Sequence, residues 1–303
     1  MAVDQKGGDG VILGCGYVGC AVARQWLTEG RRVFGVSRNK EILASIENPN
    51  FVGVVAEVDS DLWHTKVPRE PEIALNCVSS AGGGIEGYRK SYIGGNESLA
   101  KWARSAQPGR ILYTSSTTVY PFSDGREVRE EDAGGDLPES GQILLDSEEV
   151  LLGDSALADR SVVLRLAGIY GPTRHYLLDS LRSGATVLPG RGDYYLNLIY
   201  LDDIVSAVVR FASDEGVCGK AFNISDGNPS TKEEVASWIA ETLGLPPPVF
   251  DPNAVGGRRM TVNRAGGPPN RRVRIDKALA ESSWKPSFPG FRKGYEEILR
   301  SGT

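Results

Sequence analysis

Residues 10–19, with the sequence GVILGCGYVG, constrain the fold of this chain more than any other stretch. Gly14, Gly16 and Gly19 follow a short apolar run of strand type and stand at the start of a helical pattern. The first glycine of such a series permits a tight turn, the second lets the backbone approach a pyrophosphate, and the third lets the helix pack closely on the strand. The spacing therefore predicts a dinucleotide-binding turn between a strand and a helix.

The residues of this turn are the predicted contacts of the dinucleotide. The N-terminus of a helix offers unpaired N–H groups and a positive dipole end, and both suit phosphate groups. We therefore expect the cofactor to be bound there by Gly14, Gly16, Tyr17, Val18 and Gly19.

The end of the second predicted strand discriminates between the two dinucleotides. This strand covers residues 32–36 and is followed by Ser37, Arg38 and Asn39. A site for NAD would place Asp or Glu here to accept a hydrogen bond from the ribose 2′-hydroxyl, and these positions hold neither. Arg38 can instead pair with a 2′-phosphate, although an arginine in an exposed turn needs no such function. We expect Ser37 and Arg38 to bind NADP, with NAD as the less favoured cofactor.

Short β-branched runs alternate with helical patterns along the first two-thirds of the chain. This alternation favours an α/β fold with a Rossmann-type, doubly wound parallel sheet. We expect a disordered N-terminal tail over residues 1–10 and an NAD(P)-binding Rossmann domain over residues 11–171. Residues 172–303 are expected to form a smaller substrate-binding region that is partly interleaved with the sheet. Within it, residues 246–270 are rich in Pro, Gly and Arg and predict a long loop over a cleft.

Composition narrows the class of protein further. The net charge of −5 gives no reason to expect nucleic acid or an anionic membrane as a partner. The 4 cysteines and 2 histidines show no metal-ligand spacing, so we expect free thiols and no metal. No apolar run reaches the ~20 residues of a membrane span, and the start of the chain lacks the apolar core of a signal peptide. We expect a cytoplasmic protein that binds a small-molecule substrate. The sequence is compatible with a monomer and with a homodimer.

Four segments carry a resemblance to a known family. In order along the chain they read RILYTSSTTVYP, VVLRLAGIYGPTR, NLIYLDDIVSAVV and AFNISDGNPSTKEEV. The first two resemble the fifth and sixth strands of the extended short-chain dehydrogenases/reductases, also called NAD-dependent epimerases/dehydratases. The other two resemble that family's Ile-His-Val-Asp-Asp helix start and its late Asn-Ile-Ser-Asp-Gly segment. The resemblance spans nearly the whole chain and implies the same Rossmann fold.

The catalytic residues of that family carry over only in part. Its enzymes use Ser or Thr at the end of the fifth strand and a Tyr-x-x-x-Lys pair on the following helix. The resemblance places the serine on Ser116. The helix reads LPESGQILLDSEEVLL here, and alignment through its last residues places the tyrosine on Gly141 and the lysine on Leu145. Leu13 also stands where extended members have a further glycine. The chain thus resembles an atypical subgroup that lacks the Tyr-x-x-x-Lys pair.

Three residues remain as candidates for catalysis. Ser116 ends a strand at the predicted carboxyl edge of the sheet, where it could also cap local backbone. Tyr170 follows the sixth strand, and His175 can titrate near neutral pH, although a loop histidine needs no catalytic role. Arg174 and Asn197 are candidates to hold an anionic or hydroxylated ligand.

Two functions follow from these observations. The first is an NADP(H)-dependent, epimerase/dehydratase-like oxidoreductase that acts on a small polar, sugar-like substrate, because hydride transfer resides in the nicotinamide and the protein needs only to bind, orient and polarise. The second is a non-catalytic NADP(H)-binding redox sensor or interaction protein, which would account directly for the lost Tyr and Lys.

Overall fold

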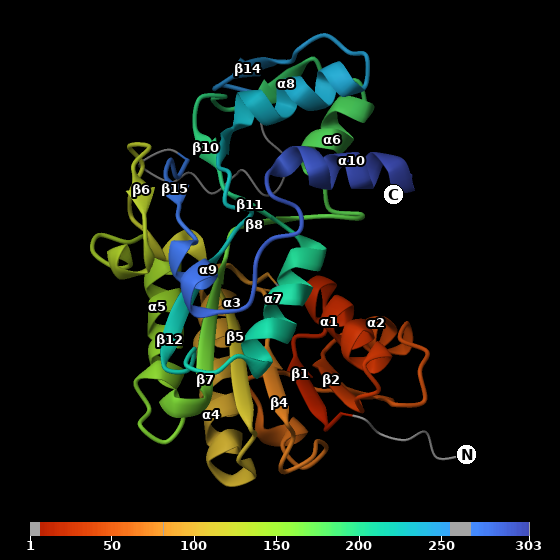
Figure 1. Cartoon of the computed structure of the whole chain (residues 1–303), viewed down its shortest axis with the longest axis vertical. Coiled ribbons are helices and arrows are strands. Elements are labelled where there is room, and N and C mark those ends of the chain that lie inside the picture. Colours follow the sequence, from red (N-terminus) through yellow and green to blue (C-terminus); the bar gives the residue numbers. More distant parts are fainter. Residues whose placement is uncertain (1–6, 81, 255–267, 303) are drawn as a thin grey trace.

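A sheet of seven parallel strands lies at the centre of the computed structural model, which describes residues 7–80, 82–254 and 268–302 (Figure 1). The strand order is β12-β7-β5-β4-β1-β2-β3. The strands are β1 (Gly10–Leu13), β2 (Val33–Ser37), β3 (Phe51–Val55), β4 (Ile73–Asn76), β5 (Arg110–Ser116), β7 (Ser161–Leu166) and β12 (Lys220–Ile224). The order runs outward in both directions from the pair β1 and β4, which confirms the predicted doubly wound Rossmann-type sheet.

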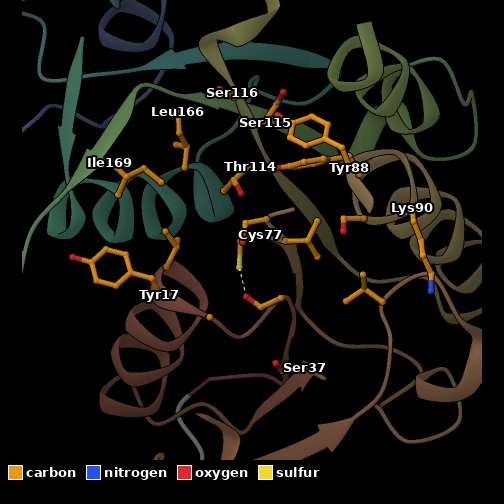
Figure 2. Close-up of a pocket in the computed structure, with 18 of the residues that line it drawn as sticks. Tyr17, Ser37, Cys77, Tyr88, Lys90, Thr114, Ser115, Ser116, Leu166 and Ile169 are labelled. Carbon is orange, nitrogen blue, oxygen red and sulfur yellow. Dashed lines mark hydrogen bonds between the residues drawn. The ribbon is translucent and has the colours of Figure 1, made fainter. Parts of the chain in front are cut away.

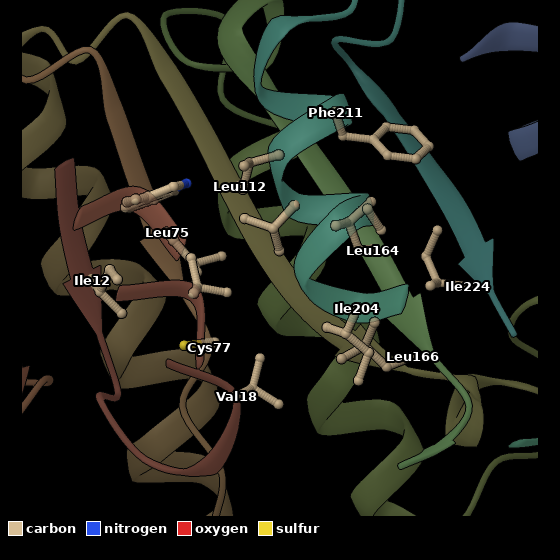
Figure 3. Packing of buried hydrophobic residues seen from close by; sticks show 14 of the residues in the cluster. Ile12, Val18, Leu75, Cys77, Leu112, Leu164, Leu166, Ile204, Phe211 and Ile224 are labelled. Carbon is tan, nitrogen blue, oxygen red and sulfur yellow. The ribbon is translucent and has the colours of Figure 1, made fainter. Parts of the chain in front are cut away.

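Helices cover both faces of this sheet. On one face lie α1 (Tyr17–Thr28), α7 (Leu201–Ser213) and α9 (Asp276–Glu281), and on the other α4 (Gly95–Ala106) and α5 (Glu139–Leu152). Figure 3 shows Ile204 and Phe211 of α7 packed among Leu112, Leu164 and Ile224 of the strands. Each such side chain contributes roughly 1.5–3 kcal/mol when it leaves water, so these two apolar layers hold the strand ends in place.

The region after residue 171 has a smaller core of its own. It contains α6 (Tyr176–Arg182), α8 (Lys232–Thr242) and α10 (Phe291–Ser301), which pack on one hydrophobic cluster. Short strand pairs complete it: β8 (Gly168–Tyr170) with β11 (Leu198–Tyr200), β9 (Val187–Pro189) with β14 (Val249–Asp251), and β10 (Tyr195–Leu196) with β13 (Ser230–Thr231). Helix α7 and strand β12 of the same region pack with the seven-stranded sheet instead.

Short elements connect these layers. Helix α2 (Lys40–Ala44) follows β2, and α3 (Gly84–Arg89) continues through a π-helical turn, Lys90–Gly94, into α4. The pair β6 (Glu127–Val128) and β15 (Arg272–Val273) joins distant parts of the chain. Single 3-10 turns are formed by Asp61–Trp63, Thr117–Val119, Glu130–Asp132 and Ala158–Arg160.

Residues 8–10 of the predicted N-terminal tail contact the rest of the fold. The Gly8 N–H donates to the Glu72 carboxylate at 2.9 Å, Arg32 pairs with Asp9 at 2.6 Å, and β1 begins at Gly10. These contacts place residues 7–10 in the fold, and residues 1–6 lie outside the described residues. Of the predicted loop over residues 246–270, the part 255–267 also lies outside them. Among the described helices, none is long and apolar enough to cross a membrane.

Candidate active site

A cleft opens at the carboxyl ends of the central strands, where open α/β sheets bind ligands. Its volume is about 410 Å³ (Figure 2). Its lining comes from the ends of β1, β2, β5 and β7 and the loops after them, from residues after β3 and β4, and from α3 with the π-helical turn that follows it. One part of the lining is the glycine turn with Ser37 and Arg38. Another part contains Ser116, Ile169 and Arg174. The cleft therefore brings the predicted cofactor residues and the predicted serine into one site.

The glycine turn has the shape that a pyrophosphate requires. Gly14 has a φ of +84°, and a Cβ there would lie 2.7 Å from the Val78 backbone. A Cβ on Gly19 would lie 2.5 Å from the Gly14 oxygen, so Gly19 serves the packing of α1 and does not line the cleft. At Gly16 the nearest atom to such a Cβ would be the Gly14 oxygen, at 3.9 Å. This open cradle beside Tyr17, the first residue of α1, fits a phosphate-bearing cofactor.

Arg38 lies at the end of β2 and lines the same cleft. Its neighbours shape the turn: the Ser37 hydroxyl accepts a hydrogen bond from the Asn39 N–H at 3.2 Å, and the Asn39 side chain accepts from the Glu41 N–H at 2.9 Å as the N-cap of α2. Ser37 and Asn39 are thus engaged locally, which leaves the guanidinium of Arg38 as the charged group that this turn presents to the cleft.

A charged cluster after β3 also lines the cleft, and the sequence did not point to it. Lys90 pairs with Glu57, and its ammonium lies 3.6 Å from the Asp59 carboxylate. The hydrogen bond from Lys90 lowers the pKa of Glu57, and the charge of Arg38 adds to this lowering. Both carboxylates are therefore engaged by a cation of the protein.

Strand β5 ends in three hydroxyl residues at the cleft: Thr114, Ser115 and Ser116. The Ser116 hydroxyl lies 3.1 Å from the Thr118 hydroxyl and accepts from the Thr118 N–H at 3.2 Å. The Ser115 hydroxyl donates to buried Glu148 of α5 at 2.5 Å. Ser116 thus has the predicted position at the strand end, and a hydrogen-bond network fixes its neighbour.

That network is buried and extends beneath the site. Glu148 and Arg165 form an ion pair at 2.8 Å, with side chains only 5% and 8% exposed. Arg165 also donates to the Tyr120 hydroxyl at 3.1 Å, and this hydroxyl donates to the Asn223 side chain at 2.6 Å. Burial raises the pKa of Tyr120 to about 12, against the opposing charge of Arg165. Tyr120 is therefore a structural residue that joins β5, β7 and β12.

Two of the predicted catalytic residues do not line the cleft. Tyr170 is buried in the C-terminal core, where its ring lies 5.4 Å from that of Tyr200 and 5.1 Å from that of Tyr295. His175 is 6% exposed, and its Nδ1 lies 2.9 Å from the Asp179 carboxylate. Apolar contacts of the C-terminal region hold the Tyr170 ring, and the Asp179 carboxylate lies beside the His175 ring, so neither side chain lines the cleft.

Of the two candidates for substrate binding, Arg174 lines the cleft and Asn197 does not. Arg174 lines the cleft, and its guanidinium carbon lies 5.5 Å from the centre of the Tyr17 ring. The Tyr17 hydroxyl in turn donates to the Pro172 carbonyl at 2.8 Å. Asn197, by contrast, donates to the Arg271 carbonyl at 2.9 Å and accepts from the Val273 N–H at 2.7 Å. Arg174 remains a ligand candidate, whereas both ends of the Asn197 amide are used in packing.

Helix α5 offers no replacement for the missing pair. Its sequence, ESGQILLDSEEVLL, contains neither tyrosine nor lysine, whatever the alignment. A Cβ on Gly141 would lie 2.9 Å from the Thr118 carbonyl oxygen, so this part of α5 is packed against the turn after β5. Leu145 packs with an apolar cluster around Tyr120.

A tyrosine from another element lines the cleft instead. Tyr88 belongs to α3, and Figure 2 shows its ring next to Ser115 and Ser116. The position of Tyr88 could not be predicted, because residues 79–95 are rich in Gly and Ser and show no regular period of apolar residues. A search for every tyrosine near the end of a predicted strand would have included it.

The sequence of the sheet region decides the family. Residues 11–225 match the model of the NAD dependent epimerase/dehydratase family. The chain belongs to this family. The match begins in β1 and ends just after β12, so it covers the seven-stranded sheet, and it confirms the predicted NAD(P)-binding fold and the oxidoreductase class. Among the described residues, no group of three or more His, Cys, Asp or Glu is placed to hold a metal ion.

Individual relatives agree with this assignment. The chain is 26% identical over 259 residues to Protein YeeZ of Escherichia coli (strain K12), covering 79% of this chain and 85% of that protein. It is 30% identical over 217 residues to the 3-diazoavenalumate denitrifying reductase of a Streptomyces species, covering 66% and 68%. The solved structure of MoeE5 in complex with UDP-glucuronic acid and NAD is similar with a TM-score of 0.81 and 19% identity, covering 98% of this chain and 100% of that one. This last likeness concerns the fold alone.

Proposed function

We propose that this chain is an NADP(H)-dependent oxidoreductase that interconverts a carbonyl and a hydroxyl group of a small polar, sugar-like substrate. The observation that carries the proposal is the shared cleft, which is lined by the glycine turn and Arg38 and also by Ser116 and Arg174. The nicotinamide supplies the hydride when it is bound. The chain itself needs to hold the cofactor, orient the substrate and provide a proton.

The preference for NADP(H) rests on the end of β2. Arg38 offers a planar fork of N–H donors that can pair with a 2′-phosphate through charge-assisted hydrogen bonds. The nearby carboxylate of Glu57 is already paired with Lys90, so it is poorly placed to accept from a ribose 2′-hydroxyl. Both observations favour the phosphorylated dinucleotide.

The substrate proposal rests on Ser116 and Arg174. The Ser116 hydroxyl can donate a hydrogen bond to a carbonyl oxygen and so polarise it for reduction. Arg174 carries the positive charge near the turn 171–174 and can bind a carboxylate, a phosphate or vicinal hydroxyls. A substrate with one carbonyl and an anionic or hydroxylated tail fits these two groups.

Titration of NADPH and NADH into the parent and into Arg38→Ala, followed by cofactor fluorescence, tests the cofactor. Loss of a charge-assisted contact costs about 1.5–3 kcal/mol, so we expect Arg38→Ala to weaken NADPH roughly 10- to 150-fold and to leave NADH nearly unchanged. Lys40→Ala is the matched control, because Lys40 is an exposed cation of the same surface that does not line the cleft. Equal weakening of both cofactors would contradict the assignment.

A non-catalytic NADP(H)-binding protein is the second candidate, and the absence of Tyr and Lys from α5 favours it. The two functions separate when NADPH oxidation is followed with a panel of ketoses, keto acids, aldehydes and nucleotide-linked keto sugars. Tight binding of NADPH without turnover of any member supports the binding protein, whereas turnover of any member supports the enzyme.

A further inference from the structure

The site described above contains a polarising hydroxyl and a cation but no proton donor from α5. Gly141 has no side chain, and Leu145 carries none that ionises. A larger residue at position 141 would need the turn after β5 to shift, since a Cβ there already lies 2.9 Å from the Thr118 oxygen. A proton donor for this end of the cleft must therefore come from another element.

Tyr88 is placed to be this donor. Its side chain is half-buried and lines the cleft together with Ser115 and Ser116 (Figure 2). Behind the cleft, Tyr88 and Leu145 pack against the same buried cluster: Val119, Tyr120, Val128, Leu144 and Val273. Helix α3 thus packs next to α5, the helix from which the phenol of the family is missing.

The local backbone holds Tyr88 in this position. Helix α3 passes into the π-helical turn Lys90–Gly94 before α4 begins, and such turns recur at functional sites. The rings of Tyr88 and Tyr92 lie 4.5 Å apart at 51°. Burial raises the pKa of Tyr92, while its hydrogen bonds with the Ser80 backbone and with the Tyr88 side chain lower it. Tyr88 is therefore positioned by the tilted ring and the hydroxyl of its neighbour Tyr92.

Lys90 does not compete for this role. It lies two positions after Tyr88, so the two side chains leave the helix on different faces. Its ammonium pairs with Glu57 and Asp59 after β3, on the Arg38 side of the cleft.

We propose that Tyr88 is the catalytic acid of this protein, donating its phenolic proton to the substrate oxygen that Ser116 polarises. The inference rests on the proposed oxidoreductase function. In reduction, the carbonyl carbon receives a hydride from NADPH, and the carbonyl oxygen receives the proton of the Tyr88 hydroxyl as the C=O double bond becomes a single bond. The products are the alcohol, NADP⁺ and the Tyr88 phenolate, which takes a proton from water because the residue is half-exposed. Oxidation of the alcohol runs through the same steps in reverse.

The test compares Tyr88→Phe with the parent in the full chain, using the carbonyl compound of the panel above that the parent reduces fastest. Removal of a general acid costs about 10²- to 10⁴-fold in rate, so we expect kcat to fall by at least 100-fold. The NADPH dissociation constant, measured by fluorescence titration, should stay within about twofold, since the variant removes no contact of the glycine turn or Arg38. Tyr176→Phe is the control, because Tyr176 is an exposed tyrosine outside the cleft lining.

The outcomes separate the two proposals. A Tyr88→Phe protein that binds NADPH and turns over like the parent overturns the assignment of Tyr88 and leaves the proposed function standing. A variant that loses NADPH affinity and turnover together also overturns it, because Tyr88 would then hold the cofactor. A parent that binds NADPH and turns over no member of the panel overturns both proposals.

Discussion

The glycine turn and helix α5 border the same cleft, and they differ in how much of the family's pattern they keep. The turn retains Gly14, Gly16 and Gly19: a Cβ would meet backbone atoms at Gly14 and Gly19, and at Gly16 the missing side chain leaves open space beside the turn. Helix α5 packs on the sheet but contains neither tyrosine nor lysine, the two residues that the family's pattern places on this helix. Cofactor binding and proton transfer can therefore be tested separately in this cleft.

This difference has a physical reason. A pyrophosphate is recognised by backbone N–H groups and by the absence of side chains, so few substitutions can replace a glycine turn. A proton donor requires only a hydroxyl within reach of the substrate, and any element that borders the cleft can supply it. The proposed donor from α3 accordingly lies next to a turn that keeps Gly14, Gly16 and Gly19.

The largest predicted effect is a loss of stability, and it concerns the buried ion pair that α5 forms with the sheet. Glu148 of α5 is buried in an ion pair with Arg165, and removing one partner of such a pair costs about 3–5 kcal/mol. We expect Glu148→Ala to lower the free energy of unfolding by this amount in urea denaturation. Glu149→Ala is the matched control, because the neighbouring carboxylate is exposed. If the two variants are equally stable, the network beneath β5 does not support the site as described.

A second comparison sharpens the role of the glycine turn. We expect Gly16→Val to weaken NADPH roughly 10- to 100-fold, because its side chain enters the space beside the turn and overpacking costs about 1–3 kcal/mol. The thermal midpoint without cofactor should stay close to that of the parent, since a Cβ at Gly16 meets its nearest atom at 3.9 Å. Gly14→Ala should do the opposite and destabilise the fold itself, because the Cβ would lie 2.7 Å from backbone. Calorimetry with and without NADPH distinguishes the two, and a Gly16→Val protein with normal affinity would exclude the turn as the phosphate site.

Substitution of Ser116 should lower turnover without weakening the binding of NADPH. The hydroxyl is expected to stabilise the reacting oxygen, and loss of such a bond costs about 0.5–1.5 kcal/mol or more. We expect Ser116→Ala to reduce kcat about tenfold while the NADPH dissociation constant stays within about threefold. Ser105→Ala, on α4 outside the cleft lining, is the control for loss of a hydroxyl. Turnover by Ser116→Ala equal to that of the parent would move the reacting centre away from β5.

The smallest effect concerns a carboxyl outside the cleft lining. Burial raises the pKa of Asp226 to about 7, with a contribution from the charge of Asp203 and against the Asn228 hydrogen bond. Because the pKa of Asp226 in the folded state lies above its ordinary value of 3.8, the parent loses stability as the pH rises from about 4 to about 7. Asp226→Asn has no such loss, so its Tm should exceed that of the parent by about 2–4 °C at pH 8 and match it near pH 4. Cofactor affinity at pH 8 should be unchanged, and a pH-independent difference in Tm would contradict this account.

Features that depend on neighbouring residues could be predicted from the sequence. The strand predicted before the glycine turn is present as β1, and the helix that begins after Thr231 has a capping box between Thr231 and Glu234, a pair at the spacing such boxes require. The glycine turn and the position of Ser116 at the end of β5 belong to the same class, because a few adjacent residues determine them.

Features that depend on distant contacts could not be predicted. Tyr170 follows a strand at the correct edge of the sheet, yet its ring stacks on Tyr295 from the far end of the chain. Tyr88 has its place in the cleft because α3 packs near α5, and no local period of residues 79–95 indicates that contact. Tertiary packing therefore decides which residues face the cleft. Local sequence patterns do not show this packing.

The pairing of β12 with β7 in the central sheet affects how the chain folds during synthesis. Its residues pair in parallel with β7, from Lys220 beside Val162 to Ile224 beside Leu166, and every residue of β7 is buried. During synthesis this apolar strand has an open edge until α6, α7 and then β12 have left the ribosome, and such edges invite pairing with other chains. Long-range pairing of this kind also slows folding, because the intervening loop must close first. A fragment that ends at residue 171 would keep the glycine turn and Ser116 but expose the edge of β7, so the nucleotide-binding half cannot be transplanted as an independent module.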